Sequence, residues 1–186
     1  SARGGSPLVH LSLFRASGFA IGVAVALLFY MLSSFYLTFS IFLQGGLHLT
    51  PFEAGLRTLP FGMGYFVASF GSASIMRRFG PRALTLGFLV QVLGFGAVIV
   101  DVTGVLASSL DIGLVVAGAG FGIVMPSVIK AVIGGVDQRH AGLASGIVIS
   151  TLQIGAALGV AIVGGVFFSV LGNGQELVSY SRAFAQ

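Results

Sequence analysis

The stretch FAIGVAVALLFYMLSSFYLTFSIFL, residues 19–43, decides the class of fold. It runs for 25 residues without Asp, Glu, Lys, Arg or His. A helix needs about 20 apolar residues to cross the hydrocarbon core of a bilayer. Because no water is available there, the backbone has to satisfy its own hydrogen bonds, and a helix does so within one segment. The stretch therefore predicts a transmembrane α-helix.

Four similar stretches follow, over residues 56–76, 83–102, 110–133 and 141–171. The chain as a whole is 56% hydrophobic and only 8% charged, whereas a soluble domain carries about 25% charged residues. The N-terminus shows neither the apolar core nor the cleavage site of a signal peptide, so we expect the chain to be the middle of a longer protein. We predict an all-α polytopic bundle of about five spans, with residues 1–186 forming part of one transmembrane domain.

The basic residues are distributed unevenly between the two ends of this bundle. Two of the nine, Arg57 and Arg182, fall at one end. The end that holds the N-terminus of the segment carries the other seven: Arg3, Arg15, Arg77, Arg78, Arg82, Lys130 and Arg139. Lys and Arg are enriched in the cytoplasmic loops of membrane proteins. The pattern predicts a multi-pass protein of the cytoplasmic membrane, with the N-terminus of this segment in the cytoplasm.

Catalytic and metal-binding chemistry finds little support in the sequence. Cysteine is absent, and the three histidines have no second ligand at a metal-binding spacing. The carboxylates fall at span ends, in loops or in the tail rather than in mid-span: Glu53, Asp101, Asp111, Asp137 and Glu176. The positive charge lies in short gaps and forms no continuous stripe that would bind nucleic acid. We expect no enzyme activity, no catalytic residue, no metal and no cofactor.

Uncharged polar residues mark one face of the first span. At about 3.6 residues per turn, the following six fall within an arc of roughly 160°: Tyr30, Ser33, Ser34, Thr38, Ser40 and Gln44. Such a face meets either a neighbouring helix or a water-accessible cavity. Gln153, which we take as the amide deepest in a span, has the same two interpretations.

Small residues and a capping pattern indicate how the helices pack and begin. Pairs of glycines four residues apart permit close helix packing in membranes, and this role is expected for Gly118, Gly122, Gly142, Gly146, Gly155 and Gly159. Thr50-Pro51-Phe52-Glu53 has the form of a capping box with proline at the first helical position.

Three blocks of sequence resemble a known family. They are residues 49–60, LTPFEAGLRTLP; residues 120–127, GFGIVMPS; and residues 141–159, AGLASG followed by QxGxAxG. Together they resemble the fourteen-span drug:proton antiporters of the major facilitator superfamily, a multidrug efflux family associated with antibiotic resistance. The resemblance implies that the spans are similar to the first five of the six in the C-terminal half of the transport core.

The turn at residues 77–82 resembles the cytoplasmic loop motif of that family. Arg78, Gly80 and Arg82 match the motif, whereas Arg77 stands in place of its Asp and Pro81 in place of a basic residue. These departures weaken a gating role for this copy of the motif.

The resemblance also implies a function. We expect part of a secondary transporter that exchanges amphipathic, often cationic drugs for protons, working with an N-terminal half that is missing from this chain. The expected cavity residues are Tyr30, Ser34, Phe121, Met125 and Gln153, because aromatic and Met side chains adapt to varied ligands. The alternative is a non-transporting scaffold or receptor subunit, which needs no polar cavity wall.

Overall fold

The computed structural model describes residues 17–80, 82–103, 110–134, 136, 141–171 and 177–185. Within these ranges the regular elements are all helices, and no strand occurs. In chain order they are α2 (Ser17–Met31), α3 (Ser34–Ile41), the π-helical turn η1 (Phe42–Gly46), α4 (Pro51–Phe79), α5 (Arg82–Val102), α6 (Leu110–Ile133), α7 (Ala141–Leu171) and α8 (Leu177–Phe184). Five helical runs are long and apolar enough to cross a membrane, which confirms the predicted all-α transmembrane fold class.

The helix limits follow the sequence closely, with one clear difference at the start of α4. Helices α6 and α7 begin and end at the residues expected, but α4 begins at residue 51 rather than 56. The capping box sets this start: the Glu53 N–H donates to Thr50 Oγ1 at 3.3 Å, and the Thr50 N–H donates to the Glu53 carboxylate at 2.8 Å. The resulting helix of 29 residues is about 44 Å long, so it extends beyond a hydrocarbon core of about 30 Å.

The first span is interrupted. Its helical run covers residues 18–46, in agreement with the span predicted over residues 19–43, but a local break divides it. Helix α2 ends at Met31 and α3 starts at Ser34. Between them, the Leu32 and Ser33 N–H groups donate three residues back, to Phe29 and Tyr30, instead of four. Serine hydroxyls compete with the backbone for helix carbonyls, and serine pairs are a common cause of helix kinks. Helices α4 and α6, by contrast, continue through their internal prolines.

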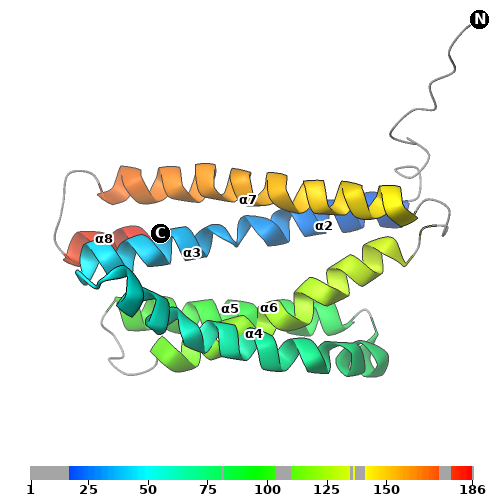
Figure 1. The fold of residues 1–186 in the computed structure, drawn as a ribbon, viewed down its shortest axis with the longest axis horizontal. Coiled ribbons are helices and arrows are strands. Elements are labelled where there is room, and N and C mark those ends of the chain that lie inside the picture. The colour runs from blue at the N-terminus through cyan, green and yellow to red at the C-terminus, as the bar shows by residue number, and fades with distance from the viewer. Residues whose placement is uncertain are drawn as a thin grey trace, which may run out of the picture.

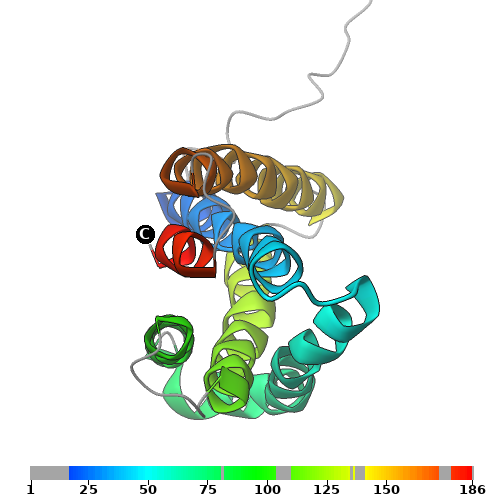
Figure 2. The same cartoon turned by 90° about the vertical axis from the view of Figure 1, so that its left-hand side faces the viewer.

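The helices form two groups that share α6. Helix α7 lies alongside α2 and α3, as Figure 1 shows. Helix α6 packs between α4 and α5, which touch each other little, and it also reaches α2. The end view in Figure 2 shows α4, α6 and α5 as the lower group, with α8 folded back beside α3. Residues 177–184 form a short helix packed on η1 and α7.

Glycines set the closest contacts between α4 and α6. Gly118 lies against the carbonyl oxygen of Phe61, and Gly122 lies against that of Tyr65, so closely that a Cβ would collide with the oxygen. Gly64 on α4 makes the reciprocal contact with α6. Without side chains in the way, the two backbones approach each other and gain dispersion contacts, which drive helix association in lipid.

Close glycine contacts also join α7 to α2. Gly155 and Gly159 lie against the carbonyl oxygens of Leu27 and Met31, and neither position has room for a Cβ. Both glycines therefore occupy a helix contact of the kind that their spacing predicted. This contact fixes α7 to the half of the first span that precedes the break.

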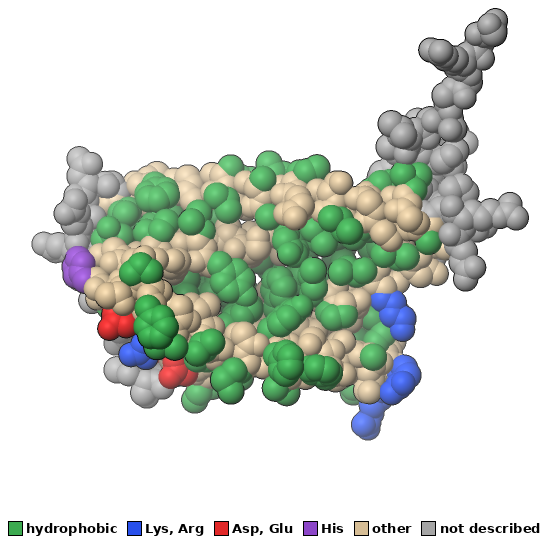
Figure 3. Space-filling model, viewed as in Figure 1, with side chains coloured by type: hydrophobic (Ala, Val, Ile, Leu, Met, Phe, Trp, Pro, Cys, Tyr) green, Lys and Arg blue, Asp and Glu red, His purple; other side chains and the backbone are tan. Residues whose placement is uncertain are grey.

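Charges gather at the two ends of the bundle, and its apolar side chains cover the length between them (Figure 3). The described basic residues Arg77, Arg78, Arg82 and Lys130 lie at the end where α4 and α6 finish and α5 begins. The described carboxylates Glu53, Asp101 and Asp111 lie at the opposite end. Arg3, Arg15 and Arg139 lie outside the described residues. The assignment of the first end to the cytoplasm stays a prediction.

Candidate substrate-contacting site

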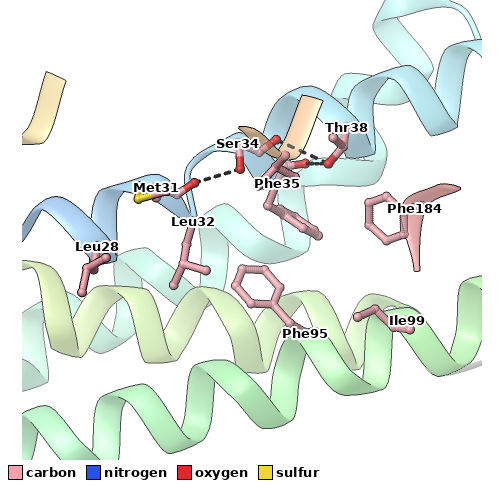
Figure 4. A pocket seen from close by; sticks show the side chains of 10 residues that line it. Leu28, Met31, Leu32, Ser34, Phe35, Thr38, Phe95, Ile99 and Phe184 are labelled. Carbon is pink, nitrogen blue, oxygen red and sulfur yellow. Dashed lines mark hydrogen bonds between the residues drawn. The ribbon is translucent and has the colours of Figure 1, made fainter. Parts of the chain in front are cut away.

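The break between α2 and α3 carries two buried hydroxyl groups near the middle of the first span. Ser34 Oγ donates to the Met31 carbonyl at 2.8 Å, and Thr38 Oγ1 donates to the Phe35 carbonyl at 3.1 Å (Figure 4). Both side chains are buried. Because each hydroxyl is satisfied by a carbonyl of its own segment, neither one requires water or a neighbouring helix.

A cavity of about 480 Å³ lies beside this break. Its wall is almost entirely apolar, because the Ser34 and Thr38 hydroxyls at its edge are engaged with the backbone. Most of the lining consists of apolar side chains, several of them labelled in Figure 4: Leu28, Met31, Leu32, Phe35, Phe95, Ile99, Val163 and Phe184. Such a space suits an apolar group and offers it little to orient a polar one.

A second aromatic group, which we call the tyrosine wall, lies where α2, α3, α4 and α6 meet. At its centre the rings of Phe61 on α4 and Phe121 on α6 are 6.1 Å apart. Tyr30 on α2 and Tyr65 on α4 lie against Phe121, with centroid distances of 6.5 and 5.9 Å. Tyr36 on α3 contacts Phe61 edge to face at 5.0 Å. These five residues define the wall.

The tyrosine side chains of the wall are partly exposed, and their hydroxyls lack partners among the described residues. No hydrogen bond joins any of the three to another described residue. Tyr36 is 38% exposed, and the other two are partly exposed. Tyr65 is the central residue of α4, fourteen residues from Pro51 and fourteen from Phe79. The wall therefore presents unpaired phenols near the middle of the spans.

The five expected cavity residues do not come together at one place. Tyr30 and Phe121 belong to the tyrosine wall, and Ser34 lines the apolar cavity. Met125, one turn beyond Phe121, is partly buried against the core around α2, α6 and α7. Gln153 is exposed on α7, about 200° around the helix from Gly155, which faces α2. A substrate-binding role for each of the five stays a prediction.

Sequence reasoning missed Tyr36, Phe61 and Tyr65. Tyr36 falls outside the polar arc of an unbroken helix, and it follows the break, where its ring contacts Phe61 on α4. Phe61 and Tyr65 lie on α4, which shows no comparable polar face. One signal was available: the chain has only four tyrosines, and Tyr30, Tyr36 and Tyr65 all fall within predicted spans.

The amide deepest in the bundle is Gln91 and not Gln153. Gln91 is 1% exposed, and neither its Nε2 nor its Oε1 has a hydrogen-bond partner. Helix α5 is short, so a residue nine positions after Arg82 and eleven before Val102 lies at its middle. It belongs to the stripe of α5 that packs on α6, where it lies against Gly120.

The sequence matches the family described as Major Facilitator Superfamily over residues 1–173. The chain belongs to the major facilitator superfamily. It is also similar to the "Probable actinorhodin transporter" of Streptomyces coelicolor (strain ATCC BAA-471 / A3(2) / M145), with 36% identity over 181 residues that cover 92% of this chain. The chain spans 31% of the length of that relative. Both matches are to transporters, which agrees with the expectation that the chain is not an enzyme.

The superfamily loop motif has a defined geometry in this chain. Gly80 takes a φ of +54°, which side chains with a Cβ rarely adopt. Arg78 and Arg82 are exposed on either side of it. Arg77, which replaces the acidic residue of the motif, donates to Ser74 Oγ at 3.1 Å. The motif therefore makes the turn, while a gating role for it stays a prediction.

Two glycines expected at a helix contact have no neighbour in this segment of the superfamily fold. A Cβ at Gly142 or Gly146 would meet no atom of the described residues within 4 Å. Both lie on the exposed face of α7 that also carries Gln153. A packing role for them requires a surface that the described residues do not supply, and it stays a prediction.

Proposed function

We propose that this chain is part of a secondary active transporter that exports small amphipathic compounds in exchange for protons. The tyrosine wall is the observation that carries the proposal. Accessible polar groups near the middle of apolar spans are costly in lipid, and they suit a cavity that substrates enter from water. A scaffold or receptor subunit needs no such groups. Membership of the superfamily and the name of the Streptomyces relative support a small organic substrate.

In this proposal the chain supplies one side of a central site. Two helical halves rock about a site near the bilayer midplane, and the tyrosine wall faces that site. The exposed face of α7, with Gly142, Gly146 and Gln153, meets the other half. The described carboxylates lie at one end of the bundle, and in this proposal the other half of the transporter supplies the group that carries the proton.

Transport by the full-length protein tests the proposal. Inverted membrane vesicles would be energised, and uptake of a fluorescent amphipathic dye would be followed before and after a protonophore is added. We expect wild-type vesicles to accumulate the dye and to release it when the proton gradient collapses. Uptake that matches vesicles without the protein would refute the transport function.

The wall is tested in the same assay with Phe121→Ala, which removes the ring at its centre. We expect uptake to fall at least several-fold at an unchanged protein level, because the substrate loses its main aromatic contact. Tyr180→Ala is the control, since Tyr180 lies on α8 against Gly45 and is not one of the five residues of the wall. Normal uptake by Phe121→Ala would remove the tyrosine wall from the transport path.

A further inference from the structure

We propose that Tyr30, Tyr36 and Tyr65 form an uncharged hydrogen-bonding subsite that selects flat aromatic ligands bearing carbonyl or hydroxyl oxygens over flat cations without oxygen. The inference rests on the proposed function and adds the class of ligand. Three separate segments bring three of the four tyrosines of the chain to one pair of phenylalanine rings. Three residues of a rare type therefore lie around the same two rings.

The rings of the wall define the shape of the ligand. Phe61 and Phe121 lie at 61° to each other, and the tyrosine rings contact them at angles between 52° and 76°. The tilted rings present both faces and edges, and aromatic groups pack on such surfaces in offset or edge-to-face arrangements. A flat ring system makes more of these contacts than a flexible aliphatic chain of the same size.

The hydroxyls of the wall define the polar groups of the ligand. A phenol both donates and accepts, and the three hydroxyls have no partner among the described residues. A ligand that enters the proposed cavity displaces water from these hydroxyls. A ligand oxygen that accepts a hydrogen bond replaces the lost bond, whereas a ligand without oxygen leaves the hydroxyl unpaired. Tyr30 and Tyr65 contact the ring of Phe121, and Tyr36 contacts the neighbouring ring of Phe61, so the proposed ligand engages hydroxyls around one pair of rings.

The charge of the wall disfavours a cation without oxygen. Every described carboxylate lies at the end of the bundle where α4 begins, α5 ends and α6 begins, far from the central residue of α4. A cation at the wall therefore loses water and gains only the attraction of ring faces, which is weak beside a full counter-charge. A neutral ligand that carries oxygen avoids this desolvation penalty.

The experiment compares two fluorescent tricyclic probes with the full-length protein in detergent. Acridone is flat, neutral and carries one carbonyl, whereas acridine orange is flat, cationic and lacks oxygen. We expect wild-type protein to bind acridone more tightly. Each of Tyr30→Phe, Tyr36→Phe and Tyr65→Phe keeps the ring and removes one hydroxyl. At least one of them should raise the Kd of acridone about two- to tenfold, the value of one neutral hydrogen bond.

The controls separate this inference from the proposed function and from misfolding. Acridine orange binding should change less than twofold in the same variants, and Tyr180→Phe should leave both probes unaffected. Size-exclusion chromatography checks that each single variant is folded. Equal losses for both probes, or unchanged acridone affinity in all three single variants, would overturn the subsite. Hydroxyl-dependent acridone binding without energised uptake would uphold the subsite and refute the transport function.

Discussion

Replacing Gln91 by leucine should make the protein more stable. The side chain is 1% exposed, and both polar atoms of its amide lack a hydrogen-bond partner. A buried polar group without a partner costs about 1–3 kcal/mol in proteins. Leucine has a similar volume and no polar atom, so Gln91→Leu should raise the free energy of unfolding by about 2 kcal/mol. For a domain of about 150–250 residues this corresponds to an increase in Tm of about 4–8 °C.

The assay is thermal unfolding of the full-length protein in detergent, followed by the loss of the monodisperse peak in size-exclusion chromatography. Gln44→Leu is the matched control, because Gln44 is exposed and donates to Ser40 Oγ at 2.7 Å. A substitution at such a surface site should change stability by no more than about 0.5 kcal/mol. A lower Tm for Gln91→Leu would refute the reasoning, since it would mean that the amide has a stabilising partner.

Three further predictions concern packing, topology and the face of α7. Gly118→Leu should reduce the yield and Tm of the folded protein, because any Cβ collides with the Phe61 carbonyl and overpacking costs about 1–3 kcal/mol. Gly96 faces open space, so the control Gly96→Leu should be tolerated. Equal yields of the two variants would contradict this packing. In intact cells an impermeant thiol reagent should label a cysteine at position 46 and spare one at position 80; the reverse pattern would invert the predicted orientation. Gln153→Leu should lower the Tm if the amide binds the other half of the protein, and should change the range of exported dyes if it contacts substrate; no change in either would exclude both roles.

Hydropathy and capping patterns predicted most of the fold. Apolar runs longer than a bilayer is thick admit few structures other than helices, so the spans were predictable from residues 19–43 onward. The capping box at Thr50 and Glu53 marks the start of α4 through local hydrogen bonds, which depend only on sequence neighbours. Gly118, Gly122, Gly155 and Gly159 lie at helix contacts because their spacing repeats on one face of a helix.

The candidate site was harder to predict, because it depends on contacts between segments. The break at Ser33 and Ser34 depends on serine hydroxyls competing with backbone N–H groups for the same carbonyls. The periodicity of apolar residues does not indicate such competition. Without the break, Tyr36 is assigned to the wrong face of the first span. The pairing of Tyr65 with Phe121 follows from how α4 packs on α6, which no single stretch of sequence encodes. Exposure of Gln153 likewise depends on which side of α7 meets α2.

The position of the break has a consequence for the dimensions of the wall. Tyr30 precedes the break and is carried by α2, which the glycine contacts of Gly155 and Gly159 hold to α7. Tyr36 follows the break and is carried by α3, whose ring contact is with α4. The two phenols therefore lie on opposite sides of the break. In the proposed subsite, the angle between α2 and α3 determines the separation of their hydroxyls.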